Sequence, residues 1–125
     1  MENKKTILVV EDEAPLQEAI SFQLEKSGVR ALIASNAEEA LAILEGSEHP
    51  ALIWLDLLMP GMGGFAFLEK LRASEKFRDV PVAIVSVSAS QEKIRRAFEL
   101  NVVDYLVKSQ YKVSDLAQRV VALLT

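Results

Sequence analysis

The chain has 125 residues, of which 50% are hydrophobic, and a formal net charge of −4 at pH 7. This length and composition predict a single domain over residues 1–125 with a substantial buried core. The acidic balance and the lack of a dense cluster of basic residues argue against direct nucleic-acid binding. The chain has no cysteine, which excludes disulfides, thiolate metal sites and cysteine nucleophiles.

The sequence also argues against a membrane or secreted protein. The apolar run behind the basic start of the chain is too short for a signal peptide. No stretch approaches the roughly 20 apolar residues that a helix needs to span a bilayer. We therefore expect a soluble protein of the cytoplasm that does not contact membranes.

The first quarter of the chain predicts a strand, a helix and a second strand. Residues 6–10 are apolar and rich in β-branched side chains, which is typical of a buried strand. Apolar residues at helical spacing predict a helix over 14–27, with Pro15 in its first turn and Gly28 as the cap at its end. A second short strand is expected over 30–34.

A second helix and a third strand follow. Asn36 and Glu39 have the spacing of a capping box, and Gly46 ends the helix that they begin. Residues 51–56 form an apolar run that ends in an acid, Asp56. A buried carboxylate is costly unless it is paired, so we place Asp56 at the carboxyl end of the strand, at the mouth of a crevice. On this stretch alone, an Asp that merely caps the following turn fits equally well.

The third helix and the fourth strand come next. Residues 65–74 predict a helix that turns Phe65, Leu68 and Leu71 inward and carries Arg72 on its exposed side. Residues 82–85 are a buried strand by type.

Two helices and one strand complete the chain. A helix over 90–100 is expected to include Phe98 in its apolar stripe. A fifth strand is predicted over 102–107, and a last helix over 113–124 with Ser114 as its N-cap. Five buried strands that alternate with helices indicate an α/β fold, a parallel sheet covered on both faces.

Several polar side chains are expected to meet at one edge of this sheet, because parallel strands have their carboxyl ends on the same side. They are Glu11 and Asp12 after the first strand, Asp56 after the third, Ser86 after the fourth and Lys108 after the fifth. Carboxylates that lie together repel one another unless a cation sits among them, and Mg²⁺ takes one or two carboxylates while leaving room for phosphate. Lys108 and Ser86 suit phosphoryl oxygens. The pattern predicts Mg²⁺-assisted phosphoryl chemistry with Asp56 as the nucleophile.

Taken one at a time, these residues have ordinary interpretations. Ser86 alone would be a strand-end hydroxyl, Tyr105 a half-buried aromatic side chain, and Lys108 a solvated lysine. The agreement of four strand ends outweighs them. Trp54 is interpreted as a packing residue, and His49, in a turn beside a proline, is not expected to be phosphorylated.

The chain resembles the receiver domain of two-component response regulators over essentially its whole length. Four pieces of the sequence carry the resemblance, namely residues 7–13, the run 56–60 with Gly64, the strand end at Ser86, and residues 104–108. The resemblance implies a flavodoxin-like, doubly wound sheet of five parallel strands in the order 2-1-3-4-5, with five helices on its two faces. This strand order is implied by the family and does not follow from the residue pattern alone.

The resemblance also implies a role for each site residue. Asp56 accepts a phosphoryl group from a phosphohistidine on a histidine kinase or a histidine phosphotransfer protein. Asp12 and Asp56 bind Mg²⁺ (or Mn²⁺) directly, Glu11 acts through water or weakly, and the backbone carbonyl of Leu58 completes the set. Lys108 pairs with the phosphoryl oxygens.

The implied output is a change of surface. Ser86 reorients toward the phosphoryl group, Tyr105 turns into the space that Ser86 leaves, and the surface of the fourth helix, fifth strand and fifth helix changes for a downstream protein. The molecule is then a monomer or a phosphorylation-dependent dimer and is not an enzyme with a separate substrate.

Two positions depart from or qualify the resemblance. Ser109 stands where the family usually has a proline joined by a cis bond; because a non-proline cis bond costs about 2.5–4 kcal/mol, we predict a trans Lys108–Ser109 peptide. Leu58, with Ser88 as its companion, is at a position that tends to modulate attack of water on the aspartyl phosphate. A bulky apolar side chain there predicts a phosphoryl group that is not unusually short-lived.

Two other functions stay open at this point. A phosphatase of the haloacid dehalogenase type also uses a nucleophilic Asp, Mg²⁺ and a lysine, but it generally has a second acid where this chain has Leu58. A receiver-like module that works by protein contact without phosphorylation is the other. The sequence does not distinguish a stand-alone regulator from one domain of a longer protein.

Overall fold

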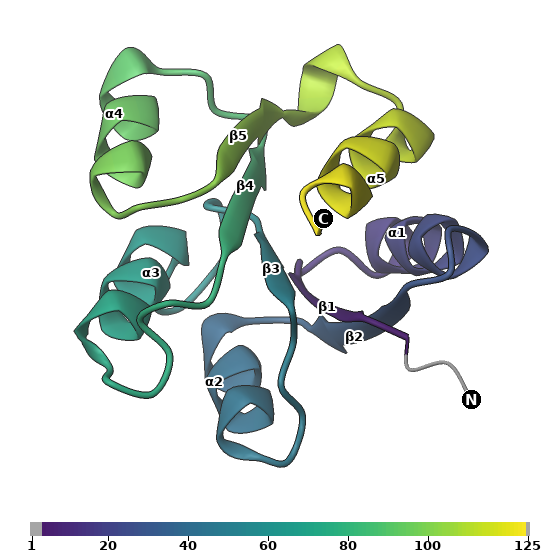
Figure 1. Cartoon of the computed structure of the whole chain (residues 1–125). Coiled ribbons are helices and arrows are strands. Elements are labelled where there is room, and N and C mark those ends of the chain that lie inside the picture. Colours follow the sequence, from purple (N-terminus) through teal and green to yellow (C-terminus); the bar gives the residue numbers. More distant parts are fainter. Residues whose placement is uncertain (1–3, 125) are drawn as a thin grey trace.

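The computed structural model describes residues 4–124 and shows a five-stranded sheet between two layers of helices (Figure 1). Residues 1–3 and 125, which complete the predicted domain, lie outside this range. The strands are β1 (Thr6–Val10), β2 (Arg30–Ala34), β3 (Leu52–Leu55), β4 (Val82–Ser86) and β5 (Asp104–Val107). The helices are α1 (Ala14–Lys26), α2 (Ala37–Glu45), α3 (Gly64–Ala73), α4 (Gln91–Glu99) and α5 (Val113–Ala122), with a 3₁₀ turn, η1 (Lys108–Gln110).

All strand pairs are parallel, and the order β2-β1-β3-β4-β5 confirms the predicted topology. β1 lies between β2 and β3, in a register that sets Val10 opposite both Ala34 and Leu55. The ends of β1 and β3 therefore lie side by side, and the residues that follow them reach the same point of the sheet edge.

Alternation along the strands divides the core into two layers. In β1, Leu8 and Val10 face α2 and α3, whereas Ile7 and Val9 face α1 and α5. Figure 1 shows the same division, with α2, α3 and α4 on one side of the sheet and α1 and α5 on the other. Trp54, the only tryptophan, is fully buried in the second layer, as its assignment to packing predicted. None of the helices within residues 4–124 combines the length and the apolar content that crossing a bilayer requires.

The α2 capping box forms, with one difference in its partners. Asn36 Oδ1 accepts a hydrogen bond from Glu39 N at 2.8 Å, as predicted. The Glu39 carboxylate reaches back to the N–H of Ser35, one residue before the N-cap, also at 2.8 Å. The result is a closed start of α2 that holds the end of β2 in place.

Two predictions about side chains on the third and fourth helices are wrong. Arg72 is not an exposed residue, because its guanidinium donates to four backbone carbonyls between α3 and β4 and after α4. Phe98 is 46% exposed and is not part of the inward stripe of α4. The reason is the place of α4 at the margin of the sheet, where Ala97 is the only fully buried residue of the helix.

The strand β5 begins later than predicted, and the helix α5 has a different N-cap from the predicted one. β5 begins at Asp104, because Val102 still bonds back to Ala97 at the end of α4. The N-cap of α5 is Lys112, without a side-chain cap, so Ser114 lies inside the helix and the predicted cap is wrong. The turn η1 was not predicted, but α5 begins at residue 113 as expected and buries Leu116, Ala117 and Val120.

Candidate functional site

Three carboxylates meet at the carboxyl edge of the sheet. Glu11 and Asp12 follow β1, Asp56 follows β3, and one ligand atom of each lies within 4.8 Å of the others. Glu11 and Asp56 are buried, with 0% and 4% exposure, whereas Asp12 is exposed. The structure thus brings together the three acids that the sequence predicted would meet.

Lys108 reaches these acids from the end of β5, on the far side of β4. Its Nζ lies 2.7 Å from Glu11 Oε1 and 3.0 Å from Asp56 Oδ2, and its side chain is 14% exposed. Burial by itself lowers the pKa of this lysine, but the two carboxylates outweigh burial, and the pKa of Lys108 lies above its usual 10.5. The lysine is therefore charged at neutral pH and lies against the predicted nucleophile.

The Glu11 side chain is held in a buried position by two donors. Besides Lys108, the backbone N–H of Glu13 donates to its Oε2 at 3.1 Å. Burial raises the pKa of Glu11, Asp56 adds to the rise, and the two hydrogen bonds and the charge of Lys108 oppose it. A second positive charge close by would favour the ionised form of this acid.

The backbone around Asp56 is fixed by its neighbours. Asp56 N donates to Val10 O at 3.1 Å, and Asp56 Oδ1 accepts from Leu58 N at 3.0 Å. The start of α3 passes so close that a Cβ on Gly64 would lie 2.5 Å from Leu57 Cα and 2.9 Å from Asp56 O. Only glycine fits there, which explains why the predicted run from Asp56 needs Gly64.

Ser86 and Tyr105 lie on the neighbouring strands. Ser86 ends β4, is 0% exposed, and its Oγ accepts weakly from Ser88 N at 3.4 Å. The Tyr105 hydroxyl donates to Ser88 O at 2.8 Å, which ties β5 to the loop before α4. Burial raises the pKa of Tyr105, and the charge of Asp56 adds to this effect while the contact with Ser88 opposes it.

The loop after Lys108 has the predicted trans geometry. None of the peptide bonds in the described chain is cis, so the prediction for Lys108–Ser109 is confirmed. Lys108 opens η1, and this tight turn directs its side chain back over the edge of the sheet toward Glu11.

One further residue of the site has no signal in the sequence pattern. Gln17, on α1, donates from its side-chain amide to Glu11 O and, at 3.1 Å, to Ser35 Oγ. A glutamine in an amphipathic helix is usually a solvated residue, so only the tertiary contact distinguishes this one.

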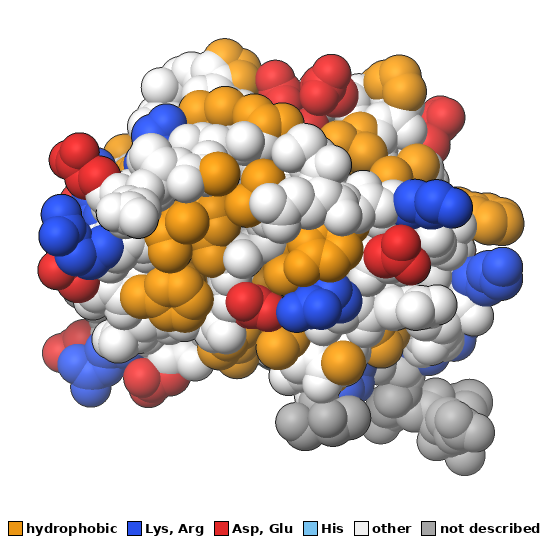
Figure 2. Space-filling view, turned by 90° about the horizontal axis from the view of Figure 1, so that it is seen from above, with side chains coloured by type: hydrophobic (Ala, Val, Ile, Leu, Met, Phe, Trp, Pro, Cys, Tyr) orange, Lys and Arg blue, Asp and Glu red, His pale blue; other side chains and the backbone are white. Residues whose placement is uncertain are grey.

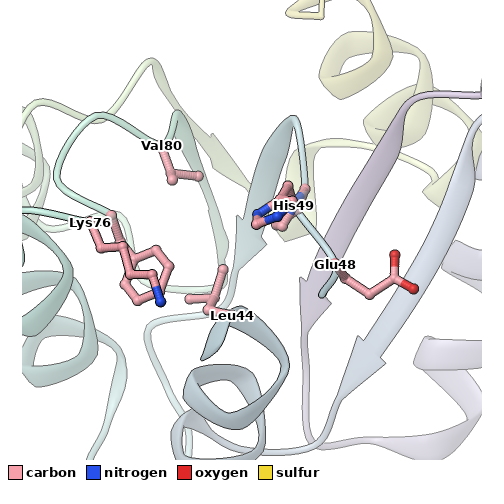
Figure 3. A pocket seen from close by; sticks show the side chains of 7 residues that line it. Leu44, Glu48, His49, Lys76 and Val80 are labelled. Atoms are coloured by element: carbon pink, nitrogen blue, oxygen red, sulfur yellow. The ribbon is translucent and has the colours of Figure 1, made fainter. Parts of the chain in front are cut away.

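A small hollow lies at the opposite end of the sheet from the acids (Figure 3). It has a volume of about 170 Å³ and is lined by residues that include Leu44, His49, Lys76 and Val80. These residues precede β3 and β4, whereas Asp56 and Ser86 stand at the other ends of these strands. The hollow is therefore separate from the acidic site, and it falls below the roughly 300 Å³ or more of typical small-molecule pockets.

The residues at the edge fit a hard divalent cation. Three carboxylates and one ammonium leave an excess of two negative charges within a few ångströms. The Asp12 side chain makes no hydrogen bond to any residue in 4–124 and is open to solvent. Oxygen donors of this kind, with solvent access for further water ligands, suit Mg²⁺ or Mn²⁺.

Comparison with known proteins agrees with this geometry. Residues 7–121 match the family model of the response regulator receiver domain. The phosphate regulon transcriptional regulatory protein PhoB of Escherichia coli (strain K12) is 33% identical over 120 residues, which cover 96% of this chain and 52% of that protein. The chain thus spans about half the length of the curated relatives it matches.

Solved structures show the same fold over nearly the whole chain. A response regulator receiver protein from Pseudomonas putida has a TM-score of 0.86 and 30% identity, and the match covers 98% of this chain and 99% of that one. The Mn²⁺-bound form of the response regulator Rcp1 has a TM-score of 0.81 and 28% identity, with 95% and 91% covered.

Proposed function

Because the chain belongs to the response regulator receiver family, we propose that it is a phospho-accepting switch in which Asp56 is the acceptor. The single observation that supports this most directly is the contact of Asp56 with Lys108 at 3.0 Å, inside a cluster of three acids within 4.8 Å. A cation site and a buried ammonium beside one carboxylate are what transfer of a phosphoryl group to that carboxylate requires.

In the proposed reaction, a phosphohistidine on a histidine kinase or a histidine phosphotransfer protein is the donor. The other ring nitrogen of the phosphohistidine first takes up a proton from solvent. A bond then forms between an Asp56 carboxylate oxygen and phosphorus, the bond from phosphorus to the imidazole nitrogen breaks, and neutral imidazole leaves. Lys108 holds the phosphoryl oxygens. Asp12, Asp56, Glu11 through water and the Leu58 carbonyl would hold Mg²⁺ or Mn²⁺, which supplies charge stabilisation at the phosphoryl oxygens.

We propose that the signal leaves through the face of α4, β5 and α5. Figure 2 looks down on the end of the molecule where Figure 1 shows these elements, and hydrophobic side chains lie across its centre, with acidic and basic side chains beside them and at the margins. Among the exposed hydrophobic residues, Phe98 lies on α4 (46% exposed), Val87 follows β4 (56%) and Val103 precedes β5 (45%). Apolar exposure of this kind suits a protein partner, or a second copy after phosphorylation. A cytoplasmic location and the absence of a separate substrate belong to the same proposal.

The test is the mass change on treatment with acetyl phosphate and Mg²⁺. We expect the wild type to gain one phosphoryl group, Asp56→Asn to gain none, and Asp79→Asn, which removes an exposed acid at the other end of the sheet, to behave as the wild type. No gain by the wild type, either here or with a phosphohistidine donor, would favour the module that works by contact alone. Continuous release of phosphate from a monoester would favour the phosphatase.

Leu58 is expected to set the lifetime of the phosphoryl group. Its side chain is 47% exposed, and it follows Asp56 so closely that its N–H donates to Asp56 Oδ1. A polar side chain there would orient water near the phosphoryl group, so Leu58→Asn should lose the label several-fold faster, in the range of roughly 2- to 10-fold for one added hydrogen bond. An unchanged dephosphorylation rate in Leu58→Asn, measured beside Leu58→Met, would remove this role.

A further inference from the structure

We infer that Gln17 is a positioning residue that sets the metal affinity of the acidic site by fixing the peptide between Glu11 and Asp12. The inference rests on the proposed function, because it assumes that these acids bind a divalent cation. Gln17 lies on α1 and is not itself one of the proposed metal ligands. Nothing in the sequence pattern distinguishes it from an ordinary helix residue.

The Gln17 amide joins two segments that are distant in the sequence. Its Nε2 donates to the backbone oxygen of Glu11, just after β1, and to Ser35 Oγ, just after β2. The side chain is half-buried between them, and the backbone N–H of Gln17 bonds to Glu13 O at 2.9 Å, so the residue bridges the acidic turn from the first turn of α1.

The hydrogen bond from Gln17 to the backbone oxygen of Glu11 can influence the position of Asp12. A peptide unit is planar, so a donor that holds Glu11 O also orients the N–H and the Cα of Asp12. Asp12 needs this support more than the other two acids do. Lys108 holds both Glu11 and Asp56, whereas the exposed Asp12 carboxylate has no hydrogen-bond partner within residues 4–124.

The other end of the bridge is also fixed. The N–H of Ser35 donates to Glu39 Oε1 at 2.8 Å, and the N–H of Glu39 donates to Asn36 Oδ1 at 2.8 Å. The N-terminal cap of α2 therefore fixes Ser35, whose hydroxyl accepts a hydrogen bond from the Gln17 amide. The same amide fixes the backbone oxygen of Glu11 in the turn after β1. Both amide protons of Gln17 are used, and an apolar side chain of similar size, such as leucine, would free the turn.

The expected effect is on metal affinity and not on the chemical step. Removing a residue that orients a metal ligand without binding the metal itself typically lowers the metal affinity or the activity by about 10- to 100-fold. Gln17→Leu should therefore raise the Mg²⁺ concentration that gives half the maximal phosphorylation rate by about 10-fold. The rate at saturating Mg²⁺ should stay within about 2-fold of the wild type, because Asp56 and Lys108 keep their contacts.

The experiment measures phosphorylation by acetyl phosphate against Mg²⁺ concentration, with Mn²⁺ binding followed directly by electron paramagnetic resonance. Gln118→Leu, the same change on the exposed side of α5, is the control and should match the wild type. Ser35→Ala removes only one end of the bridge and should show a smaller shift, about 2- to 3-fold. If Gln17→Leu fails to fold, Ser35→Ala decides the question alone.

The outcomes separate the two proposals. An unchanged half-saturating Mg²⁺ concentration in both variants, with a normal response of the wild type, overturns the role of Gln17 and leaves the proposed function intact. A lower plateau rate with the same half-saturating concentration also overturns it, because that is the result of a smaller folded fraction. A wild type that binds neither ion and gains no phosphoryl group overturns the proposed function itself.

Discussion

At the scale of single residues, the site depends on one cation that compensates buried negative charge. Glu11 is fully buried, and Lys108 is the only lysine or arginine in the described part of the chain that forms an ion pair with it. A buried charge that loses its partner costs much more than a surface pair is worth. Lys108 therefore serves stability as well as the proposed chemistry.

Replacing Lys108 should show both roles. Lys108→Met should lower the free energy of unfolding by on the order of 3 kcal/mol, because it leaves two buried carboxylates without a cation. The measurement is urea unfolding followed by Trp54 fluorescence, with Lys112→Met, on an exposed lysine of the next loop, as the control. Mg²⁺ should restore more stability to Lys108→Met than to the wild type. An equal gain would show that the cation and Lys108 do not compensate the same negative charge.

Tyr105 predicts a dependence of stability on pH. Its folded-state pKa lies above the usual 10.0, mainly because the ring is partly buried. As the pH rises above 10, the unfolded chain loses the phenol proton first, so the unfolded state binds fewer protons and the free energy of unfolding falls until the folded pKa is passed. The stability advantage of the wild type over Tyr105→Phe should therefore shrink between about pH 9 and pH 11 in urea unfolding. An advantage that grows over this range would contradict the direction of the shift.

At the scale of elements, α4 is the least firmly packed helix. One of its residues is buried, whereas α1 has two buried residues, α2 and α5 have three each and α3 has four. At the surface, α4 contacts α3 through Arg96. This residue forms an ion pair with Glu69 at 2.8 Å, and its guanidinium lies over the Phe65 ring. An element of this kind opens at low cost, which suits the moving part of a switch.

The C-terminal end of α4 is held by Arg72. Its guanidinium donates to the carbonyls of Leu100 and Asn101 after α4 and to those of Arg78 and Val80 before β4, at 2.7–3.2 Å. We expect Arg72→Met to lower the free energy of unfolding by about 2–3 kcal/mol, since several carbonyls lose a charged donor at once.

Hydrogen exchange should localise this effect. The amides of residues 100–103 should lose protection in Arg72→Met and keep it in Lys70→Met, which changes an exposed lysine of the same helix. A loss of protection spread evenly over the sheet would mean that Arg72 contributes to global stability only.

At the scale of the whole molecule, the fold concentrates negative charge at one point. Because β1 and β3 are neighbours, three acids that are up to 45 residues apart in the sequence (Glu11 to Asp56) come within 4.8 Å of each other. Like charges at this distance oppose folding and favour a bound cation. Stability and function are therefore in conflict at this edge of the sheet.

Asp12→Asn should make the conflict measurable. Without metal, the variant should be more stable than the wild type by about 0.5 kcal/mol, a value typical of an exposed charge interaction, and the difference should shrink at high salt. With Mg²⁺, the wild type should gain stability as the ion binds the folded state, and Asp12→Asn should gain less. Thermal unfolding in EDTA and in Mg²⁺ tests this, with Asp115→Asn on α5 as the control. A less stable Asp12→Asn in EDTA would show that repulsion among the acids is not significant.

The sequence by itself determined the alternation of strands and helices, the buried character of the strands and the set of acids expected at one edge. It could do so because hydrophobic period, glycine and proline positions, and the order of strand ends are local properties. The strand order came from the resemblance to the family, and the structure confirms it.

Only the tertiary structure decided which polar side chains pair. Arg72 and Gln17 both occupy positions in helices where solvent exposure is the usual outcome, and each instead bonds to backbone groups of segments distant in the sequence. Phe98 satisfies the helical period but lies at the margin of the sheet, where the described residues leave 46% of it exposed. The physical reason is the same in each case: period and propensity depend on near neighbours in the chain, whereas a hydrogen bond or a buried face depends on which segments the fold places opposite.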